Sequence, residues 1–264
     1  MTIDLFDEPR AKLERVKKHL RELAHEEAAF AASRPVEAYL GLRPEGNFSI
    51  MIRATSFPPL AASVVAGDAI NNLRSALDLT ISAACRANGT TNLGNTYFAI
   101  AKEGERGWDD LVTGKRKRMK AATPAIVQLT RSFKPWAGGN DILYAISHLA
   151  GIDKHQALLG MSVHRGGMAL SGMTLSHVEN KPIQMRAKQY ARLSREEPEA
   201  SLIDFDHGVK VSVDGPIKIN IRLGFTANQI QPHIGAVSFL SDALSETAKI
   251  VETFATASTE GALR

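Results

Sequence analysis

Apolar residues recur at helical spacing along one long stretch of the chain, from about Leu60 to Asn88. At roughly 100° per residue they form one continuous face, as a helix packed against a protein core requires. This face comprises Ala66, Ala69, Ile70, Leu73, Leu77, Thr80, Ile81 and Ala84. The pattern predicts a long central helix with one buried side.

Three polar residues, Asn71, Arg74 and Asp78, lie together on the flank of this apolar face. Arg74 and Asp78 are four residues apart and can pair on the helix surface, and Asn71, one turn earlier, can share a partner with Arg74. Such a stripe beside a core is either a structural ion-pair network that locks two helices or a functional site. Both interpretations stay open from the sequence.

Helical spacing returns in four other parts of the chain. The predicted helices run from Asp7 to about Ala32, from Thr123 to about Phe133, from Asn140 or Asp141 through Leu149, and from Ile234 to Phe254. Asp7, Thr123 and Asn140 are residue types that cap helix N-termini. We expect His19 on the solvated outer face of the first helix, and a loop from Gly94 to Gly107.

Strand-like alternation appears in two regions. Val36–Leu42 and Asn47–Ala54 flank a turn at 43–46 and predict a hairpin. After Ala157, the candidate strands are 159–164, 168–177, 183–193, 201–205, 209–213 and 217–221. The last two alternate apolar and polar residues on either side of Asp214-Gly215-Pro216, which predicts a turn between paired antiparallel strands.

These elements together predict an α+β fold. A helical bundle with an N-terminal hairpin is followed by an antiparallel sheet and a closing C-terminal helix. The chain divides into a helical part at 1–156 and a sheet-rich part at 157–264, which we expect to pack as one unit. Its 264 residues, 44% hydrophobic and 23% charged, fit an ordinary globular protein.

Composition narrows the location and the cysteine chemistry. No apolar run approaches the roughly 20 residues of a membrane span, and the acidic N-terminus lacks the features of a secretory signal. We therefore expect a cytoplasmic protein without a membrane partner. Cys85 is the one cysteine, so an internal disulfide is excluded, and its position predicts a small buried side chain.

The net charge of +4 comes mostly from one basic run: Lys115, Arg116, Lys117, Arg118 and Lys120. A run of this kind can contact the phosphates of a nucleic acid. Aromatic residues make up 6% of the chain and do not interleave with the basic ones, as stacking on single-stranded bases requires. The alternative interpretation is a plain solvated surface.

A second polar cluster lies at the end of the predicted helix that starts near Asp141. Asp153 falls close to the apolar face of that helix if Gly151 does not end it, and an inward-pointing carboxylate needs a partner. We expect Arg74 to be that partner, because a bidentate Arg–carboxylate pair is favoured at such sites. The cluster also contains Ser147, His148, Lys154 and His155. From the two clusters, the candidate ligand-binding set is Asn71, Arg74, Asp78, Asp153, Lys154 and His155.

Three segments carry a resemblance to a known family: Asn-Leu-Arg-Ser-Ala-Leu-Asp at 72–78, Tyr-Phe-Ala-Ile at 97–100, and Gly-Ile-Asp-Lys-His at 151–155. They resemble the signature segments of a widespread bacterial family without an established function, and the resemblance covers most of the chain. Family members read His-Asn-Leu-Arg-Ser-Ala-Leu-Asp-His and Asp-Lys-His-Arg. Here Asn71 and Leu79 replace the two histidines, and Gln156 replaces the arginine.

The first segment is also similar to the Arg-x4-6-His motif of HEPN ribonucleases, all-helical dimers that cleave RNA without a metal ion. Acid–base cleavage needs a group that titrates near neutrality, and histidine supplies it. Leu79, Thr80 and Ile81 occupy the three possible histidine positions after Arg74. The resemblance implies a member that has lost nuclease activity or that uses His155 differently.

No catalytic residue is assigned from the sequence, and no metal site or cofactor is predicted. There is no Gly-x-Ser-x-Gly elbow and no phosphate-binding glycine fingerprint. We expect most of the histidines at 164, 177, 207 and 233 to be ordinary surface or turn residues.

Two functions follow as expectations. The first is a non-enzymatic binding or interaction protein with a polar Arg/Asp/His pocket, whose ligand is a small molecule or a protein. The second is an RNA-binding or RNA-processing protein of degenerate HEPN type.

Leu79 lies away from the core face of the central helix, so another element or a second subunit must cover it, and we expect a homodimer.

Overall fold

The computed structural model describes residues 4–114, 118–179, 181–188, 191–226 and 234–264. Its helices are α1 (Asp7–Ala32), α2 (Leu60–Ala87), α3 (Gly104–Thr113), α4 (Pro124–Ser132), α5 (Asp141–His155) and α6 (Ala236–Thr259). Its strands are β1 (Val36–Leu42), β2 (Phe48–Ala54), β3 (Met161–Leu170), β4 (Met173–His177), β5 (Met185–Ala187), β6 (Arg192–Leu193), β7 (Glu199–Phe205), β8 (Val209–Val213) and β9 (Ile217–Phe225). The predicted α+β class is confirmed. None of the described helices is long and apolar enough to cross a membrane.

The chain forms two compact units that alternate along the sequence. Unit 1 combines Met1–Leu23, Val64–Leu159 and Ser238–Arg264, and unit 2 combines Ala24–Ser63 and Gly160–Val237. The fold changes from helix to strand after α5, close to the predicted division near residue 156. Each unit is nevertheless assembled from separated segments, because the N-terminal hairpin belongs with the later strands and α6 belongs with the earlier helices.

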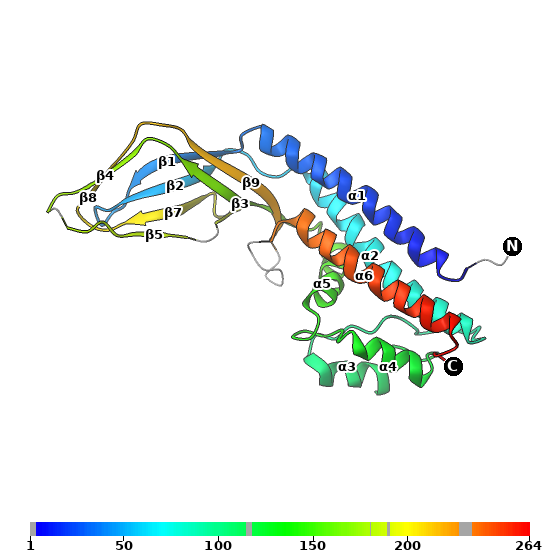
Figure 1. Ribbon diagram of the computed structural model, residues 1–264. Helices are drawn as coiled ribbons and strands as arrows, with labels where there is room; N and C mark the ends of the chain where they lie inside the picture. The colour runs from blue at the N-terminus through cyan, green and yellow to red at the C-terminus, as the bar shows by residue number, and fades with distance from the viewer. Residues whose placement is uncertain (1–3, 115–117, 180, 189–190, 227–233) are drawn as a thin grey trace. The chain divides into compact units, whose positions relative to one another are not determined.

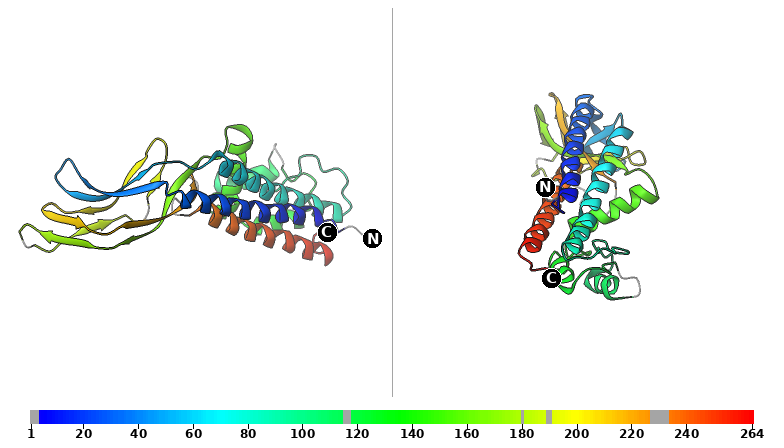
Figure 2. Two further views of the ribbon diagram at one scale, coloured as in Figure 1. Left: turned by 90° about the horizontal axis from the view of Figure 1, so that it is seen from above. Right: turned by 90° about the vertical axis from the view of Figure 1, so that its right-hand side faces the viewer.

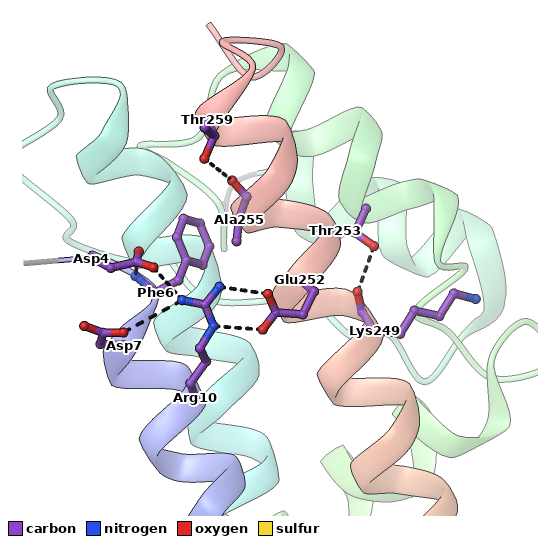
Figure 3. Close-up of polar contacts among 9 residues, drawn as sticks. All are labelled: Asp4, Phe6, Asp7, Arg10, Lys249, Glu252, Thr253, Ala255 and Thr259. Atoms are coloured by element: carbon purple, nitrogen blue, oxygen red, sulfur yellow. Dashed lines mark hydrogen bonds and ion pairs between the residues drawn. The ribbon is translucent and has the colours of Figure 1, made fainter.

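In unit 1, α1, α2 and α6 run side by side (Figures 1 and 2). The guanidinium of Arg10 on α1 binds Glu252 on α6 through two hydrogen bonds of 2.8 Å, and it also binds Asp4 (Figure 3). Arg86 on α2 pairs with Glu8 on α1. Because these ion pairs lie at exposed positions, they align the helices and add little stability. The stability comes from the apolar faces between them.

The core of unit 1 follows the pattern predicted for the central helix. All eight residues of the predicted apolar face of α2 are fully buried. Thr80, the polar member of the set, donates its hydroxyl to the carbonyl of Ala76, which satisfies it inside the helix. Cys85 is buried, as expected, and burial raises the pKa of its thiol to about 11. The thiol therefore stays protonated near neutral pH.

The capping predictions for two other helices are also confirmed. The Thr123 side chain accepts a hydrogen bond from the N–H of Ile126 at the start of α4, and Asn140 accepts one from Leu143 at the start of α5. Gly151 does not end α5, which continues to His155. The prediction of a loop as far as Gly107 is wrong, because α3 begins at Gly104. This helix is 10 residues long, contains two glycines and has no side-chain cap at its N-terminus, so the sequence gives few signals of where it begins.

The described residues of unit 2 form three antiparallel sheets. Their strand orders are β1-β2-β7-β5, β6-β3-β9 and β4-β8. The predicted N-terminal hairpin is present, with Val36 opposite Ala54 and Leu42 opposite Phe48. β1 and β9 are each the end strand of a sheet.

The predicted pairing of β8 with β9 is wrong. β8 pairs with β4 and β9 pairs with β3, so the segments 161–177 and 209–225 run antiparallel as one long ribbon. At the bend of this ribbon, the N–H of Asp214 donates to the carbonyl of Gly172 across the two strands. Gly172 has a positive φ of 67°, and a Cβ on it would lie 2.9 Å from the nitrogen of Gly215. The Asp-Gly-Pro sequence is therefore a kink within the ribbon.

Two histidines that we expected at the surface are buried. His19 on α1 is 3% exposed, so it belongs to the inner face of that helix. His164 on β3 is also 3% exposed, and its Nε2 lies 2.9 Å from the hydroxyl of Ser162. A Cβ on Gly224 would lie 2.1 to 2.4 Å from three atoms of the imidazole ring. The ring therefore occupies space that exists because residue 224 has no side chain.

Candidate functional site

The polar stripe on α2 forms the predicted ion pair. Nη2 of Arg74 lies 2.8 Å from Oδ1 of Asp78, one helical turn away. The same nitrogen donates to the carbonyl of Phe98 at 2.8 Å, and the N–H of Phe98 donates to Oδ1 of Asp78 at 3.0 Å. Arg74 and Asp78 thus hold both backbone polar groups of Phe98, and they fix the segment that follows α2 onto the helix.

The electrostatic surroundings of this pair are cationic. Burial raises the pKa of Asp78, while Arg74, Lys154 and Arg118 act in the opposite direction. Burial also lowers the pKa of Arg74, opposed by Asp78, but a guanidinium stays charged in proteins. One carboxylate therefore lies among three cationic side chains, which leaves a local excess of positive charge.

Asp153 lies at the interface of α5 with α2, as predicted, but its partner is Asn71 and not Arg74. Nδ2 of Asn71 donates to Oδ2 of Asp153 at 2.7 Å. The other oxygen of Asp153 and one nitrogen of Arg74, Nη1, are buried without a hydrogen-bond partner among the described residues. The carboxylate packs against Gly67, where a Cβ would lie 2.4 Å from Oδ1. The missing side chain at Gly67 therefore makes room for Asp153.

We expect Gly67→Ala to weaken the α2–α5 interface by about 1 kcal/mol. The new methyl displaces Asp153 from Asn71, at a cost of about 1 to 3 kcal/mol, and the gain in helix propensity returns about 1 kcal/mol. Urea denaturation measures the difference. In an Asp153→Ala background the clash is absent, so the same substitution should become stabilising. If Gly67→Ala has the same effect in both backgrounds, the proposed contact is not the cause.

The remaining members of the predicted set lie farther out. Lys154 and His155 are exposed at the end of α5, and Lys154 contributes to the charge around Asp78. The structure thus brings Asn71 to Asp153 and Arg74 to Asp78, whereas it gives His155 no polar contact with this set. Leu79 is partly exposed, and the homodimer inferred from it stays a prediction.

A pocket of about 830 Å³ has Phe98 among its lining residues. Its walls are the segment from Phe98 to Glu103, the inner side of α3, Arg118 and Ser147 of α5. Trp108 of α3 anchors this arrangement by donating its indole N–H to the carbonyl of Ala99 at 2.9 Å. The Arg74–Asp78 pair therefore holds the backbone of a residue that lines this pocket, which the sequence did not reveal.

Several polar groups of the pocket are available for a ligand. Among the described residues, neither the N–H nor the C=O of Ile100 has a hydrogen-bond partner, and the Ser147 hydroxyl has none. Lys102 and Arg118 form no ion pair with a described residue. Sequence reasoning included Ser147 in the second polar cluster and Ile100 in a signature segment, but nothing in the pattern pointed to Lys102.

The basic run is only partly described. Lys115, Arg116 and Lys117 lie outside the described residues, while Arg118 and Lys120 are exposed. Arg118 lines the pocket and Lys120 does not. Within the described part of the chain, no three His, Cys, Asp or Glu side chains are placed to hold a metal ion.

Comparisons with family models, with curated proteins and with solved structures gave no match. The resemblance to the bacterial family and to HEPN domains therefore rests on the residues of the motifs.

Proposed function

We propose that the protein works in the cytoplasm as a binding protein for a small polar molecule that carries an anionic group, held in the pocket between α3, α5 and the 98–103 segment. The observation that carries this proposal is that Lys102 and Arg118 line a pocket of about 830 Å³ without an ion-pair partner among the described residues. A carboxylate or phosphate group satisfies such cations, and pockets of this size suit small molecules.

The mixed lining narrows the ligand further. Glu103 and Asp110 also line the pocket, so it offers acceptors as well as cations. The free N–H and C=O of Ile100 and the Ser147 hydroxyl add neutral hydrogen-bonding groups. A ligand with an anionic group and separate donors, such as a hydroxy acid, matches this set better than a purely apolar molecule.

In this proposal, the Arg74–Asp78 pair positions the pocket and does not touch the ligand. It holds the backbone of Phe98 through two hydrogen bonds, and Phe98 begins the wall of the pocket. The family-like Asn-Leu-Arg-Ser-Ala-Leu-Asp segment would then be a structural support for the Tyr-Phe-Ala-Ile segment. This role explains why the two segments occur together in one chain.

A thermal-shift titration with citrate and inorganic phosphate tests the proposal. A ligand present at about 100 times its Kd stabilises the folded state by about 2.7 kcal/mol, so the melting temperature should rise by several degrees. Arg118→Gln and Lys102→Gln should each reduce this rise. Lys120→Gln is the matched control, because Lys120 is an exposed neighbouring cation outside the pocket.

The same variants separate this function from RNA binding. If the protein binds a short single-stranded RNA with strong salt dependence, Lys120→Gln should weaken that binding as much as Arg118→Gln does. If neither citrate nor phosphate changes the melting temperature, or if the Lys120 and Arg118 variants respond equally, the pocket is not the anion site proposed.

A further inference from the structure

Along the outer edge of β9 in unit 2, the backbone groups of Ile217, Ile219 and Ile221 have no hydrogen-bond partner among the described residues. The N–H of Thr226 donates to Gly160 on the β3 side, whereas the N–H of Leu223 donates away from β3, to the carboxylate of Glu27. Backbone groups alternate in direction along an antiparallel strand, so residues two apart point the same way. The groups that point away from β3 with Leu223 are those of Ile217, Ile219 and Ile221.

The outer edge of β1 is open in the same way. The carbonyl of Pro35 accepts a hydrogen bond from the N–H of Thr55 on the β2 side. By the same alternation, the N–H and C=O of Val36 point away from β2. β1 and β9 approach each other, but each is the end strand of its sheet and neither pairs with a further described strand along this edge.

A groove of about 420 Å³ lies between these two edges. Its apolar walls are formed by Pro35 and Val36 on one side and by Ile217, Ile219 and Ile221 on the other. The three isoleucines are partly exposed, and they alternate with the exposed Lys218 and Asn220. The groove thus combines apolar side chains with free backbone donors and acceptors.

The groove is also flanked by positive charge. Arg34 and Lys218 line it, and neither forms an ion pair with a described residue. Arg34 has a φ of 53°, in the left-handed region where glycine ends helices at lower energetic cost.

We propose that this groove binds an extended segment of a partner protein, with hydrophobic residues at alternate positions and acidic residues between them, which adds as a strand to the outer edge of β9. The backbone of the segment would pair with the groups of Ile217, Ile219 and Ile221, and its apolar side chains would enter the groove. Its acidic residues complement Arg34 and Lys218. A second copy of β9 fits less well, because Lys218 and Arg222 would meet like charges across the new pair.

A fluorescence-anisotropy titration of the full chain tests this proposal. The probe is a labelled peptide of alternating valine and glutamate, and a matched peptide of alternating valine and lysine is its charge-reversed control. The first peptide should bind saturably below about 1 mM, and the second should bind at least about fivefold more weakly at low salt.

Two variants locate the binding at the groove. Arg34→Gly combined with Lys218→Gln should lower the affinity about fivefold while the melting temperature is kept or raised, because glycine relieves the backbone at residue 34. Ile219→Pro should abolish binding, since it removes an N–H that points away from β3, and circular dichroism should show the fold retained. Lys210→Gln, an exposed lysine outside the groove, should change nothing.

Three results would overturn the proposal. The first is the absence of saturable binding of the acidic peptide to the wild-type protein at about 1 mM. The second is binding that the Arg34/Lys218 and Ile219 variants leave unchanged. The third is concentration-dependent self-association that Ile219→Pro abolishes, which would assign the edge to a second copy of the chain.

Discussion

Arg74→Ala should lower the free energy of unfolding by about 3 kcal/mol, since it removes one partner of a largely buried ion pair. The Arg74 side chain is 16% exposed and that of Asp78 is 30% exposed. Without the guanidinium, the carboxylate of Asp78 keeps its desolvation cost, and the carbonyl of Phe98 loses a donor. Urea denaturation at neutral pH measures the loss.

A double-mutant cycle separates this pair from ordinary surface charge. The Arg74→Ala and Asp78→Ala effects should be non-additive by at least about 1 kcal/mol, because the two side chains are in contact. Lys17→Ala is the control, since Lys17 pairs with Glu14 at an exposed site and should cost less than about 1 kcal/mol. Additive effects in the cycle would show that the pair is not coupled.

The pH dependence of the Arg74→Ala variant gives an independent check. Burial raises the pKa of Asp78 in the folded state, and removal of Arg74 takes away an opposing charge. When the pKa of a carboxyl group is raised in the folded state, the ionised carboxylate destabilises the fold above that pKa. Protonation removes this destabilisation as pH falls through the raised pKa. The destabilisation of the variant should therefore shrink in mildly acidic solution. A penalty that is constant with pH would contradict the argument.

The sequence predicts the central helix well because one local pattern determines it. In α2, eight positions repeat at helical spacing, and all eight are buried. In α6 the sequence pattern predicts a buried face made of Val237, Leu240, Leu244, Ala248, Val251 and Phe254. Leu240, Val251 and Phe254 are buried, whereas Val237, Leu244 and Ala248 are partly exposed. An alanine-rich helix offers apolar residues on several sides, so its neighbours decide which side is covered.

Strand pairing could not be predicted because it depends on distant segments. Asp214-Gly215-Pro216 has the composition of a hairpin turn, and local reasoning joins the strands on either side of it. In the structure these strands pair with 161–177 instead. The register of a sheet is selected by burial across many residues, and this information is not contained in the turn.

Of the candidate site, only the contact within one helix could be predicted from the sequence. The Arg74–Asp78 pair follows from a spacing of four residues within one helix. The Asn71–Asp153 contact depends on how two helices pack, and Gly67, which makes room for it, gives no sign of this in the sequence. The pocket depends on α3, a short helix with two glycines and no side-chain N-cap, so the lining of the pocket could not be assembled from the sequence.

The second large expected effect is a loss of stability in acid, caused by the protonation of His164 in unit 2. Burial lowers the pKa of His164 from 6.5 to about 4, and the positive charge of Arg192 acts in the same direction. Nδ1 of the ring is buried without a hydrogen-bond partner among the described residues, so nothing there compensates a second proton. Protonation of this ring therefore opposes folding.

The sign of the pH effect follows from the depressed pKa. Above pH 6.5 the imidazole is neutral in both the folded and the unfolded state, and its contribution to stability is fully present. As pH falls from 6.5 through about 4, the unfolded chain binds a proton that the folded chain excludes. Stability should therefore fall by up to about 3 kcal/mol, at close to 1.4 kcal/mol per pH unit.

The contribution of His164 can be isolated by comparing pH profiles between variants. Other groups also titrate in acid, so the measured quantity is the slope of the unfolding free energy between pH 4 and 6.5 in urea denaturation. His164→Gln lacks the titrating ring. Its slope should therefore correspond to about one fewer proton taken up on unfolding, whatever its stability at neutral pH. His155→Gln removes an exposed histidine and should keep the wild-type slope. If the two variants lose stability in parallel with the wild type, the buried imidazole is not the group that destabilises the fold in acid.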